Sequence, residues 1–342
     1  MNLGIDLGTS RIVIYDPNQG VVLDEPAVIA IAKKDGHVVA FGTEAEAMLG
    51  RTPDSIIAVR PVQKGVIAEY DLAEKLLRCC LSRVCFNRIT KPCVAVSVAE
   101  QVTEVEQRSF IEAVISAGAR RVTLVPETVA AAIGAGVDVS LPLGQMIVNA
   151  GGGTVDVSVL SLKGEAVSAT VRTAGAAMNE AIVRYVRAQY GLLISDTMAE
   201  RLKTDIGCAL PLAETLTATA KGRDSMTGLP RAITVTSDEV CEAIREPLRE
   251  ILDAVAQVLE ITPPELAGDI IETGMTLTGG LAQLRRLPEL LSQATGIPCH
   301  VADNPAQCVA IGAGKALKYA SSFSKVYDLG SFSYRLSDNV TN

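Results

Sequence analysis

The sequence predicts an α/β protein made of two related domains, on three observations. First, 342 residues are enough for roughly two domains at about 150 residues each. Second, short apolar strands alternate along the chain with helices that carry one apolar face, as in proteins whose sheets are covered by helices on both sides. Third, the pattern of residues 3–15 returns at residues 146–159: an apolar strand, a polar residue, a glycine turn ending in Thr, and a β-branched strand. Such an echo predicts a duplicated domain.

Local signals place the elements between these two hairpins. Thr103 and Glu106 form a capping box that begins a helix, and Gly118 ends it. A second helix is expected from near Ser237 up to Pro263-Pro264, which cannot continue it. Strands are expected at 93–98, 122–125 and 275–278, and a loosely ordered tail from residue 321.

The composition excludes several classes of function. With 31 Lys+Arg against 39 Asp+Glu, the chain has no excess of positive charge for binding nucleic acid. No apolar run reaches the about 18 residues of a membrane span, and the first residues lack the basic head and apolar stretch of a signal peptide, so we expect neither. The eight cysteines form no CxxC pair and are expected to be buried free thiols, while His37 and His300 are expected on the surface. Carboxylates and glycines must therefore carry any chemistry.

The two glycine turns are candidates for phosphate binding. Gly8-Thr9-Ser10 and Gly151-Gly152-Gly153-Thr154 each offer backbone N–H groups that can form a concave nest for an anion. Either turn alone is more often an ordinary tight hairpin. The matched pair, each with a carboxylate or an amide at the strand end, favours a clamp that holds a polyphosphate from both sides.

Two further glycine clusters occur late in the chain. Residues 277–281 follow a strand and are expected to open a helix whose N–H groups could meet a nucleoside or a phosphate. Residues 310–314 are expected to precede another helix, and close helix packing through small residues explains them at least as well.

Together these segments resemble the actin-like ATPases and, within that superfamily, the MreB/Mbl-type bacterial actins. The resemblance covers about residues 1–320, and the blocks that carry it are Gly4–Thr9, Arg60-Pro61, Gly65–Ala68, Thr103–Glu106, Ala130–Gly136, Tyr190–Ile194, Pro263–Ala267 and Leu277–Gly280. It implies a duplicated actin-like (ribonuclease H-like) fold with two domains around a nucleotide cleft. The implied boundaries are domain I at 1–139 plus 316–330, with a small subdomain at about 29–70; domain II at 140–315, with a small subdomain at about 180–240; and a flexible tail at 331–342.

The resemblance also implies residue roles. Asp6 would hold Mg²⁺ largely through water, and Glu127 would orient the attacking water in hydrolysis. Asp156 matches the acidic residue after the second glycine turn. Glu200 and Lys203 match the pair that contacts adenosine, and the alternative interpretation is a solvated surface ion pair. The implied cofactors are ATP and Mg²⁺, and the other residues expected at the nucleotide are Gly8, Thr9, Ser10, Arg11, Asn149, Gly151, Gly152, Gly153, Thr154, Gly279, Gly280 and Leu281.

Several departures from the family pattern surround the nucleotide. Asn149 replaces an aspartate, which weakens the attraction for Mg²⁺ and its waters. Arg11 replaces a small polar residue, and its cation could bind phosphate and partly replace the metal. The others are Pro126 and Thr128 around Glu127, the loss of two acidic residues from 174–179, and Leu281 in place of a third glycine, where it would crowd the nucleoside loop. We therefore predict that the fold and nucleotide binding persist while hydrolysis is slow or lost, so that the protein is at most a slow ATPase.

One segment is a candidate for membrane contact. Residues 83–89 place apolar side chains among basic ones, so Val84 and Phe86 could insert beside anionic headgroups. The alternative is a helix end that packs both side chains into the core.

The resemblance implies a cytoskeletal protein that binds ATP, forms membrane-associated filaments and organises cell-wall synthesis to determine rod shape. Its implied partners are further copies of itself, the cytoplasmic face of the membrane and cell-wall elongation membrane proteins, with no nucleic acid. The implied location is cytoplasmic and peripheral on the inner face of the cell membrane. Two alternatives stay open: a non-polymerising nucleotide-sensing adaptor of the same fold, and a small-molecule kinase, for which no convincing substrate-side residues are present.

Overall fold

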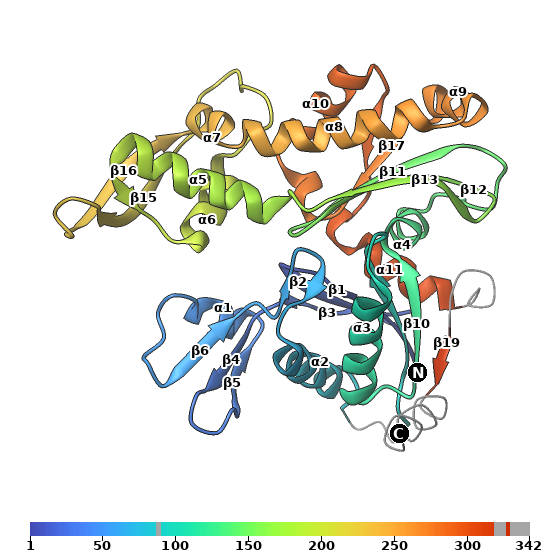
Figure 1. Ribbon diagram of the computed structural model, residues 1–342, viewed down its shortest axis with the longest axis horizontal. Coiled ribbons are helices and arrows are strands. Elements are labelled where there is room, and N and C mark those ends of the chain that lie inside the picture. The colour runs from blue at the N-terminus through green and yellow to red at the C-terminus, as the bar shows by residue number, and fades with distance from the viewer. Residues whose placement is uncertain (87–89, 318–325, 329–342) are drawn as a thin grey trace, which may run out of the picture. The chain divides into compact units, whose positions relative to one another are not determined.

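The computed structural model describes residues 1–86, 90–317 and 326–328, the last three by backbone alone (Figure 1). The chain divides into two compact units. Unit 1 contains the described residues of Met1–Leu143, Leu160–Ala166 and those from Ala306 onward, and unit 2 contains Gly144–Val159 and Val167–Pro305. The chain returns to unit 1 earlier than the expected residue 316. It does so because the helix that begins at Cys308 packs against elements of unit 1.

A six-stranded sheet forms the centre of unit 1. Its order is β19-β10-β9-β1-β2-β3, with β1, β9 and β10 parallel and the other neighbours antiparallel. Most residues of the parallel strands are buried, because both faces of the sheet are covered. The strands are β1 (Asn2–Leu7), β2 (Arg11–Asp16), β3 (Gly20–Pro26), β9 (Cys93–Val98), β10 (Arg121–Pro126) and β19 (Val326–Asp328).

The tail prediction is corrected at one place. Val326–Asp328 pair with β10 as strand β19, whereas a loosely ordered tail was expected from residue 321. A strand of three residues is too short to show an alternation of apolar and polar residues in the sequence. Residues 318–325 and 329–342, which include the predicted flexible tail at 331–342, lie outside the described residues.

Two pairs of helices cover the sheet of unit 1. The helices are α2 (Tyr70–Val84), α3 (Glu104–Ser116), α4 (Glu127–Gly134) and α11 (Cys308–Ala316). The side chains of Leu3 and Ile5 on β1 share one core with those of α2 and α3. The predicted capping box is present, with the Glu106 N–H donating to Thr103 Oγ1 at 3.2 Å and the Thr103 N–H donating to the Glu106 carboxylate at 2.7 Å.

Helix α11 packs on the opposite face of β1 through glycines. A Cβ on Gly4 would lie 2.3 Å from the Ala310 carbonyl oxygen, and one on Gly312 would lie 1.7 Å from that of Ala130. Residues 310–314 therefore lie inside a helix, and the expectation that they precede one is wrong. The close-packing interpretation of this glycine cluster is confirmed.

A smaller layer completes unit 1. The three-stranded sheet β5-β4-β6 lies next to helix α1 (Thr43–Met48), and β7 and β8 pair as a two-stranded sheet. The strands are β4 (Ile29–Ala32), β5 (Val38–Phe41), β6 (Ile56–Val59), β7 (Val62–Gln63) and β8 (Val66–Ile67).

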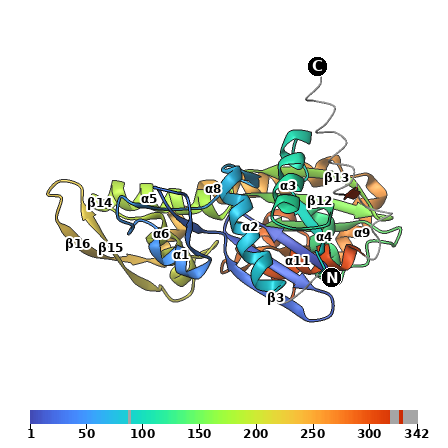
Figure 2. The same cartoon turned by 90° about the horizontal axis from the view of Figure 1, so that it is seen from below.

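Unit 2 repeats the plan with a five-stranded sheet and its own three-stranded sheet. The larger sheet has the order β13-β12-β11-β17-β18 and the smaller β14-β15-β16. The smaller sheet lies beside α5 and α6 in both views (Figures 1 and 2). The strands are β11 (Gln145–Ala150), β12 (Val155–Ser161), β13 (Gly164–Val171), β14 (Leu192–Leu193), β15 (Thr217–Asp224), β16 (Pro230–Thr236), β17 (Met275–Thr278) and β18 (Cys299–Val301). The helices are α5 (Gly175–Tyr190), α6 (Asp196–Ile206), α7 (Ser237–Ala243), α8 (Arg245–Ile261), α9 (Pro264–Thr273), α10 (Leu287–Thr295), and the 3₁₀ helices η1 (Gly280–Gln283) and η2 (Pro305–Gln307).

The single helix expected from Ser237 is two helices, α7 and α8, separated at Ile244. Pro247 explains the break, because it has no N–H for the Ala243 carbonyl and its ring would clash with that group. In the described ranges, no helix is both long and apolar enough to cross a membrane.

Candidate functional site

The two glycine turns share one backbone geometry. The Gly8 N–H donates to the Arg11 carbonyl at 3.0 Å, and the Gly151 N–H donates to the Thr154 carbonyl at 2.9 Å. A Cβ on Gly8 or on Gly151 would lie 3.2 Å from the same acceptor oxygen in its own turn. Each turn follows a central strand of its sheet, β1 in unit 1 and β11 in unit 2. The sequence echo is therefore also a structural repeat.

Asp6 stands at the end of β1, just before the first turn. Its half-buried carboxylate accepts a hydrogen bond from Ser97 Oγ at 3.2 Å. Burial raises the pKa of Asp6 to about 6, against the hydrogen bond from Ser97, and the charge of Asp24 adds to the rise. A cation near Asp6 would stabilise the ionised form of its carboxylate. The residue therefore fits the single carboxylate expected to hold a hydrated Mg²⁺.

The polar side chains of the first turn are engaged within unit 1. Arg11 Nε donates to Asp24 Oδ1 at 2.7 Å, and Arg11 Nη2 donates to the Asp24 carbonyl at 3.1 Å. Gln307 donates to the other Asp24 carboxylate oxygen at 2.9 Å. Thr9 Oγ1 accepts the Gly65 N–H at 3.2 Å, and the Ser10 carbonyl accepts a backbone N–H at 2.9 Å. The structure thus pairs the Arg11 guanidinium with Asp24, and its binding to phosphate stays a prediction.

Glu127 is the first residue of α4, directly after β10. The Thr128 hydroxyl next to it is fully buried and donates to the carboxylate of Glu100. Asp6 lies near the carboxyl end of β1, and Glu100 and Glu127 follow those of the parallel strands β9 and β10. This is the edge at which ligands bind in such sheets. Sequence reasoning missed Glu100. Its position two residues after a buried strand was the available signal.

The polar side chains of Asn149 and Asp156, on the strands that flank the second turn, are buried. Asn149 is 4% exposed, and its Oδ1 accepts a hydrogen bond from the Thr278 hydroxyl at 3.2 Å. Asp156 is fully buried on β12 and accepts a hydrogen bond from Thr170 Oγ1 at 2.6 Å. A Cβ on Gly279, whose φ is +84°, would lie 2.2 Å from the Ala150 carbonyl oxygen. This glycine lets the end of β17 approach the end of β11 next to the turn.

The start of helix α5 packs on the second turn. The N–H of Ala176 donates to the Gly152 carbonyl at 2.8 Å, and the N–H of Gly175 donates to the Gly151 carbonyl at 3.3 Å. The Lys203 ammonium, on α6, donates to the Gly175 carbonyl at 2.9 Å. Helix starts attract anions, so this arrangement places a partial positive charge and a lysine beside the turn.

Glu200 and Lys203 form part of a network inside unit 2. Their ion pair measures 3.1 Å, and Asn179 donates to the same Glu200 oxygen. The Lys203 side chain is only 8% exposed, so the interpretation as a solvated surface pair is wrong for this residue. The pair instead joins α6 to the start of α5.

The third glycine cluster does not open a full helix. Gly280 begins η1, which has four residues, and a Cβ on Gly280 would meet nothing within 4 Å. Leu281 is 6% exposed and belongs to the hydrophobic core of unit 2. The structure therefore places the Leu281 side chain in the core of unit 2, whereas the sequence predicts that it crowds the nucleoside loop.

The two apolar candidates for membrane contact differ in exposure. Val84 ends α2 and packs against the core of unit 1, whereas Phe86 is 78% exposed. Arg83, also in the candidate segment, pairs with Glu25 at 3.0 Å. Residues 87–89 of the candidate segment lie outside the described residues.

The histidines and cysteines lie as follows. His37 and His300 are exposed, as predicted. All eight cysteines are free, but only three of them are buried, so the expectation of buried thiols holds for those three and not for the half-buried remainder. Among the residues that the structure describes, no group of three or more His, Cys, Asp or Glu is placed to hold a metal ion.

Comparison with known proteins gives consistent matches. The chain matches the family described as MreB/Mbl protein over residues 1–325. It is 48% identical to the cell shape-determining protein MreB of Escherichia coli (strain K12), covering 93% of each chain, and 41% identical to the cell shape-determining protein Mbl of Bacillus subtilis (strain 168), covering 92% of this chain and 95% of the relative. Among solved structures, MreB 5 of Spiroplasma citri bound to AMPPNP is 33% identical with a TM-score of 0.88, covering 93% of this chain and 96% of that one. A MamK double helical filament, 17% identical with a TM-score of 0.78 over 92% of this chain and 98% of that one, shows the same fold. The actin-like fold predicted from the sequence is confirmed.

Proposed function

The chain belongs to the MreB/Mbl family of cytoskeletal actin homologues, and we propose that it binds ATP with Mg²⁺, polymerises, and helps to determine cell shape. The observation that carries nucleotide binding is the paired turn geometry, with Gly8 and Gly151 making the same hydrogen bond in the two units. Support comes from the relative MreB 5 of Spiroplasma citri, which was crystallised bound to AMPPNP and to ADP.

The two turns supply different chemistry to the proposed site. Backbone N–H groups of both turns would donate to phosphate oxygens, and the start of α5 would add its partial positive charge. Asp6 would hold Mg²⁺ through water, and the ion would offset the negative charge of the phosphates. Glu200, fixed by Lys203 and Asn179, is the group best held to accept a hydrogen bond from the nucleoside.

We expect slow hydrolysis, because the second turn has a neutral amide, Asn149, where the family pattern has an aspartate. Glu127 would accept a hydrogen bond from the attacking water and orient it. Its neighbour Thr128 is hydrogen-bonded to Glu100, which ties the start of α4 to the segment after β9. Asn149 contributes an amide where a carboxylate would attract the metal more strongly.

Phe86 would make the contact with the membrane. Its side chain is exposed two residues after the end of α2, whereas that of Val84 packs against the core of unit 1. Filaments would form by a repeated contact between copies that does not close on itself. The proposed site of action is the cytoplasmic face of the membrane, where cell-wall elongation membrane proteins would be the partners.

Electron microscopy of the purified protein on a lipid monolayer tests this function. With Mg-ATP present, we expect filaments on the lipid, and with Phe86→Ser we expect filaments in solution but few on the monolayer. Isolated monomers under every condition would instead support a non-polymerising adaptor. Phosphate release measured in the same samples should be slow, and a fast rate that Glu127→Ala abolishes would contradict the expectation of slow hydrolysis.

A further inference from the structure

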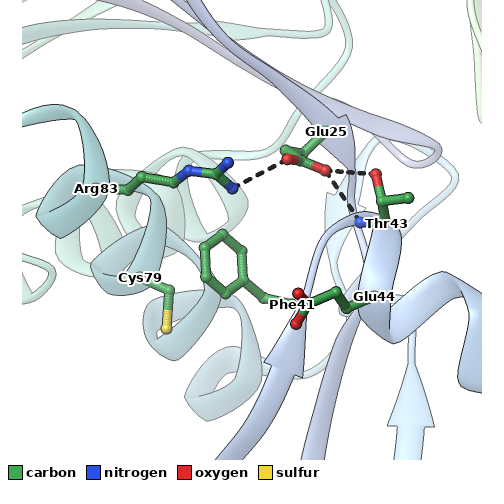
Figure 3. Close-up of a pocket in the computed structure, with 6 residues that line it drawn as sticks. All are labelled: Glu25, Phe41, Thr43, Glu44, Cys79 and Arg83. Atoms are coloured by element: carbon green, nitrogen blue, oxygen red, sulfur yellow. Dashed lines mark hydrogen bonds and ion pairs between the residues drawn. The ribbon is translucent and has the colours of Figure 1, made fainter.

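A cavity lies within unit 1, and none of its lining residues is assigned to the nucleotide. Its volume is about 440 Å³, and its lining residues are Glu25, Phe41, Thr43, Glu44, Cys79 and Arg83 (Figure 3). Glu25 comes from β3, Phe41 from β5, Thr43 and Glu44 from α1, and Cys79 and Arg83 from α2. This volume is in the range of about 300–1,000 Å³ that small-molecule sites occupy.

One acid and the base of the cavity neutralise each other. Glu25 Oε1 accepts a hydrogen bond from Arg83 Nη1 at 3.0 Å, while Oε2 accepts the Thr43 N–H at 3.0 Å and the Thr43 hydroxyl at 2.7 Å. Burial raises the pKa of Glu25, but the bonds from Thr43 and Arg83 outweigh it and hold the pKa below its ordinary value. Glu25 therefore stays ionised and balances the guanidinium, so that the cavity offers no excess positive charge to an anion.

The second acid has no such partner. Glu44 is exposed on α1, and within the described part of the chain its carboxylate takes part in no hydrogen bond or ion pair. The lining thus holds two carboxylates against one guanidinium, and the unbalanced charge is that of Glu44.

The rest of the wall suits an aliphatic or aromatic group. Phe41 projects into the centre of the lining residues in Figure 3, between Cys79 and Glu25. Burial raises the pKa of the Cys79 thiol, so it is uncharged near neutral pH and packs as a small apolar group. Arg83 already lies 5.9 Å from the centre of the Phe41 ring, which shows that a cation can approach this ring.

We infer that this cavity binds a small organic cation, an ammonium or guanidinium carried on an aliphatic stem. The charged head pairs with Glu44, and the stem lies against Phe41 and Cys79. The cation has two possible sources, a free polyamine or a lysine or arginine side chain of a partner protein. Either one would bridge helix α2 and the smaller layer of β5 and α1.

Protection of Cys79 from alkylation tests the inference directly, because this thiol lines the cavity. The full-length protein is treated with iodoacetamide at constant ionic strength, and labelling of each cysteine is followed by mass spectrometry. The probes are putrescine, N-acetyl-lysine amide and N-acetyl-arginine amide, each compared with added NaCl. We expect at least one organic cation to slow labelling of Cys79 in a saturable manner, with Cys93, Cys241 and Cys299, which are also half-buried, labelled at unchanged rates.

Variants assign the effect to the cavity. Glu44→Gln removes the unbalanced charge from an exposed side chain and should abolish protection. Glu46→Gln is the matched control, since Glu46 lies on the same helix but pairs with Arg60 at 3.4 Å and does not line the cavity, so protection should persist. Phe41→Leu should weaken protection about threefold by removing the ring.

The outcomes separate clearly. Protection by putrescine but not by the amino-acid amides identifies a free polyamine as the source, and the reverse identifies a basic side chain. No protection by any probe up to saturating concentrations, equal protection by NaCl, or unchanged protection in Glu44→Gln would overturn the inference. Nucleotide is absent throughout, so the result does not depend on the proposed ATP site.

Discussion

The two glycine turns have the same backbone and opposite surroundings. The first lies beside a carboxylate, Asp6, and an exposed ion pair between Arg11 and Asp24. The second lies beside a neutral amide, Asn149, and is covered by the start of α5, which Lys203 holds in place. Because the proposed phosphate nest consists of backbone N–H groups, duplication can keep it while the side chains diverge. On this difference we propose that the first turn binds the metal and the second binds the anion.

The largest expected effect comes from adding a side chain at Gly279, which lies next to the second turn. Gly279→Ala would place a Cβ 2.2 Å from the Ala150 carbonyl oxygen at a φ of +84°, so we expect a loss of about 2–4 kcal/mol in the free energy of unfolding. Gly280→Ala is the control, because a Cβ there meets nothing within 4 Å and the change should stay within about 0.5 kcal/mol. Urea denaturation measures both. Equal stability of the two variants would contradict the close approach of β17 to β11.

A pH series distinguishes the turns by charge. The pKa of Asp6 is raised from 3.8 in the unfolded chain to about 6 in the folded protein, so the folded state binds the proton more tightly. Its contribution to stability is present below pH 3.8 and is lost as the pH rises through about 6. Relative to Asp6→Asn, the wild type should therefore lose about 2 kcal/mol between pH 4 and 7.

Urea unfolding of both proteins at each pH provides the measurement. Asn149 does not titrate, so Asn149→Ala should shift stability by the same amount at every pH. A difference between wild type and Asp6→Asn that does not vary with pH would remove the charge distinction between the turns.

The Lys203 network should contribute less than Gly279. Lys203→Met keeps the buried stem but leaves the Gly175 carbonyl and Glu200 without the ammonium, and we expect a loss of about 1–2 kcal/mol together with weaker ATP binding. The matched control is Arg184→Met, which breaks an exposed ion pair with Glu180 at 3.9 Å and should cost less than about 0.5 kcal/mol. Calorimetric unfolding and ATP titration check the pair. If both variants behave alike, α5 is not held by Lys203.

The smallest effect is expected at Arg11. Its guanidinium is held by Asp24 and its side chain is 47% exposed, so Arg11→Gln should change ATP affinity by less than about twofold and stability by less than about 1 kcal/mol. Equilibrium titration with a fluorescent ATP analogue measures the affinity. A large loss of affinity would show that Arg11 leaves Asp24 to bind phosphate.

Much of the fold could be predicted from short patterns in the sequence. The capping box at Thr103 and the two hairpins depend on residues a few positions apart, and the structure confirms them. The break between α7 and α8 also has a local signal, Pro247. It was missed because apolar residues recur at helical spacing on both sides of it. The contact of Thr128 with Glu100 and that of Lys203 with Gly175 span 28 residues each, and they depend on how strands and helices pack. No short pattern in the sequence could reveal those partners.

The effect of Mg²⁺ on ATP affinity tests most directly whether the metal binds at the first turn. Titration with a fluorescent ATP analogue, with Mg²⁺ or with EDTA, should show that Mg²⁺ tightens binding to the wild type. Asp6→Asn should lose most of this enhancement while still binding the nucleotide through the second turn, and Asn149→Asp should increase it. An Asp6→Asn variant that is folded and keeps the full enhancement would contradict the assignment of the metal to the first turn.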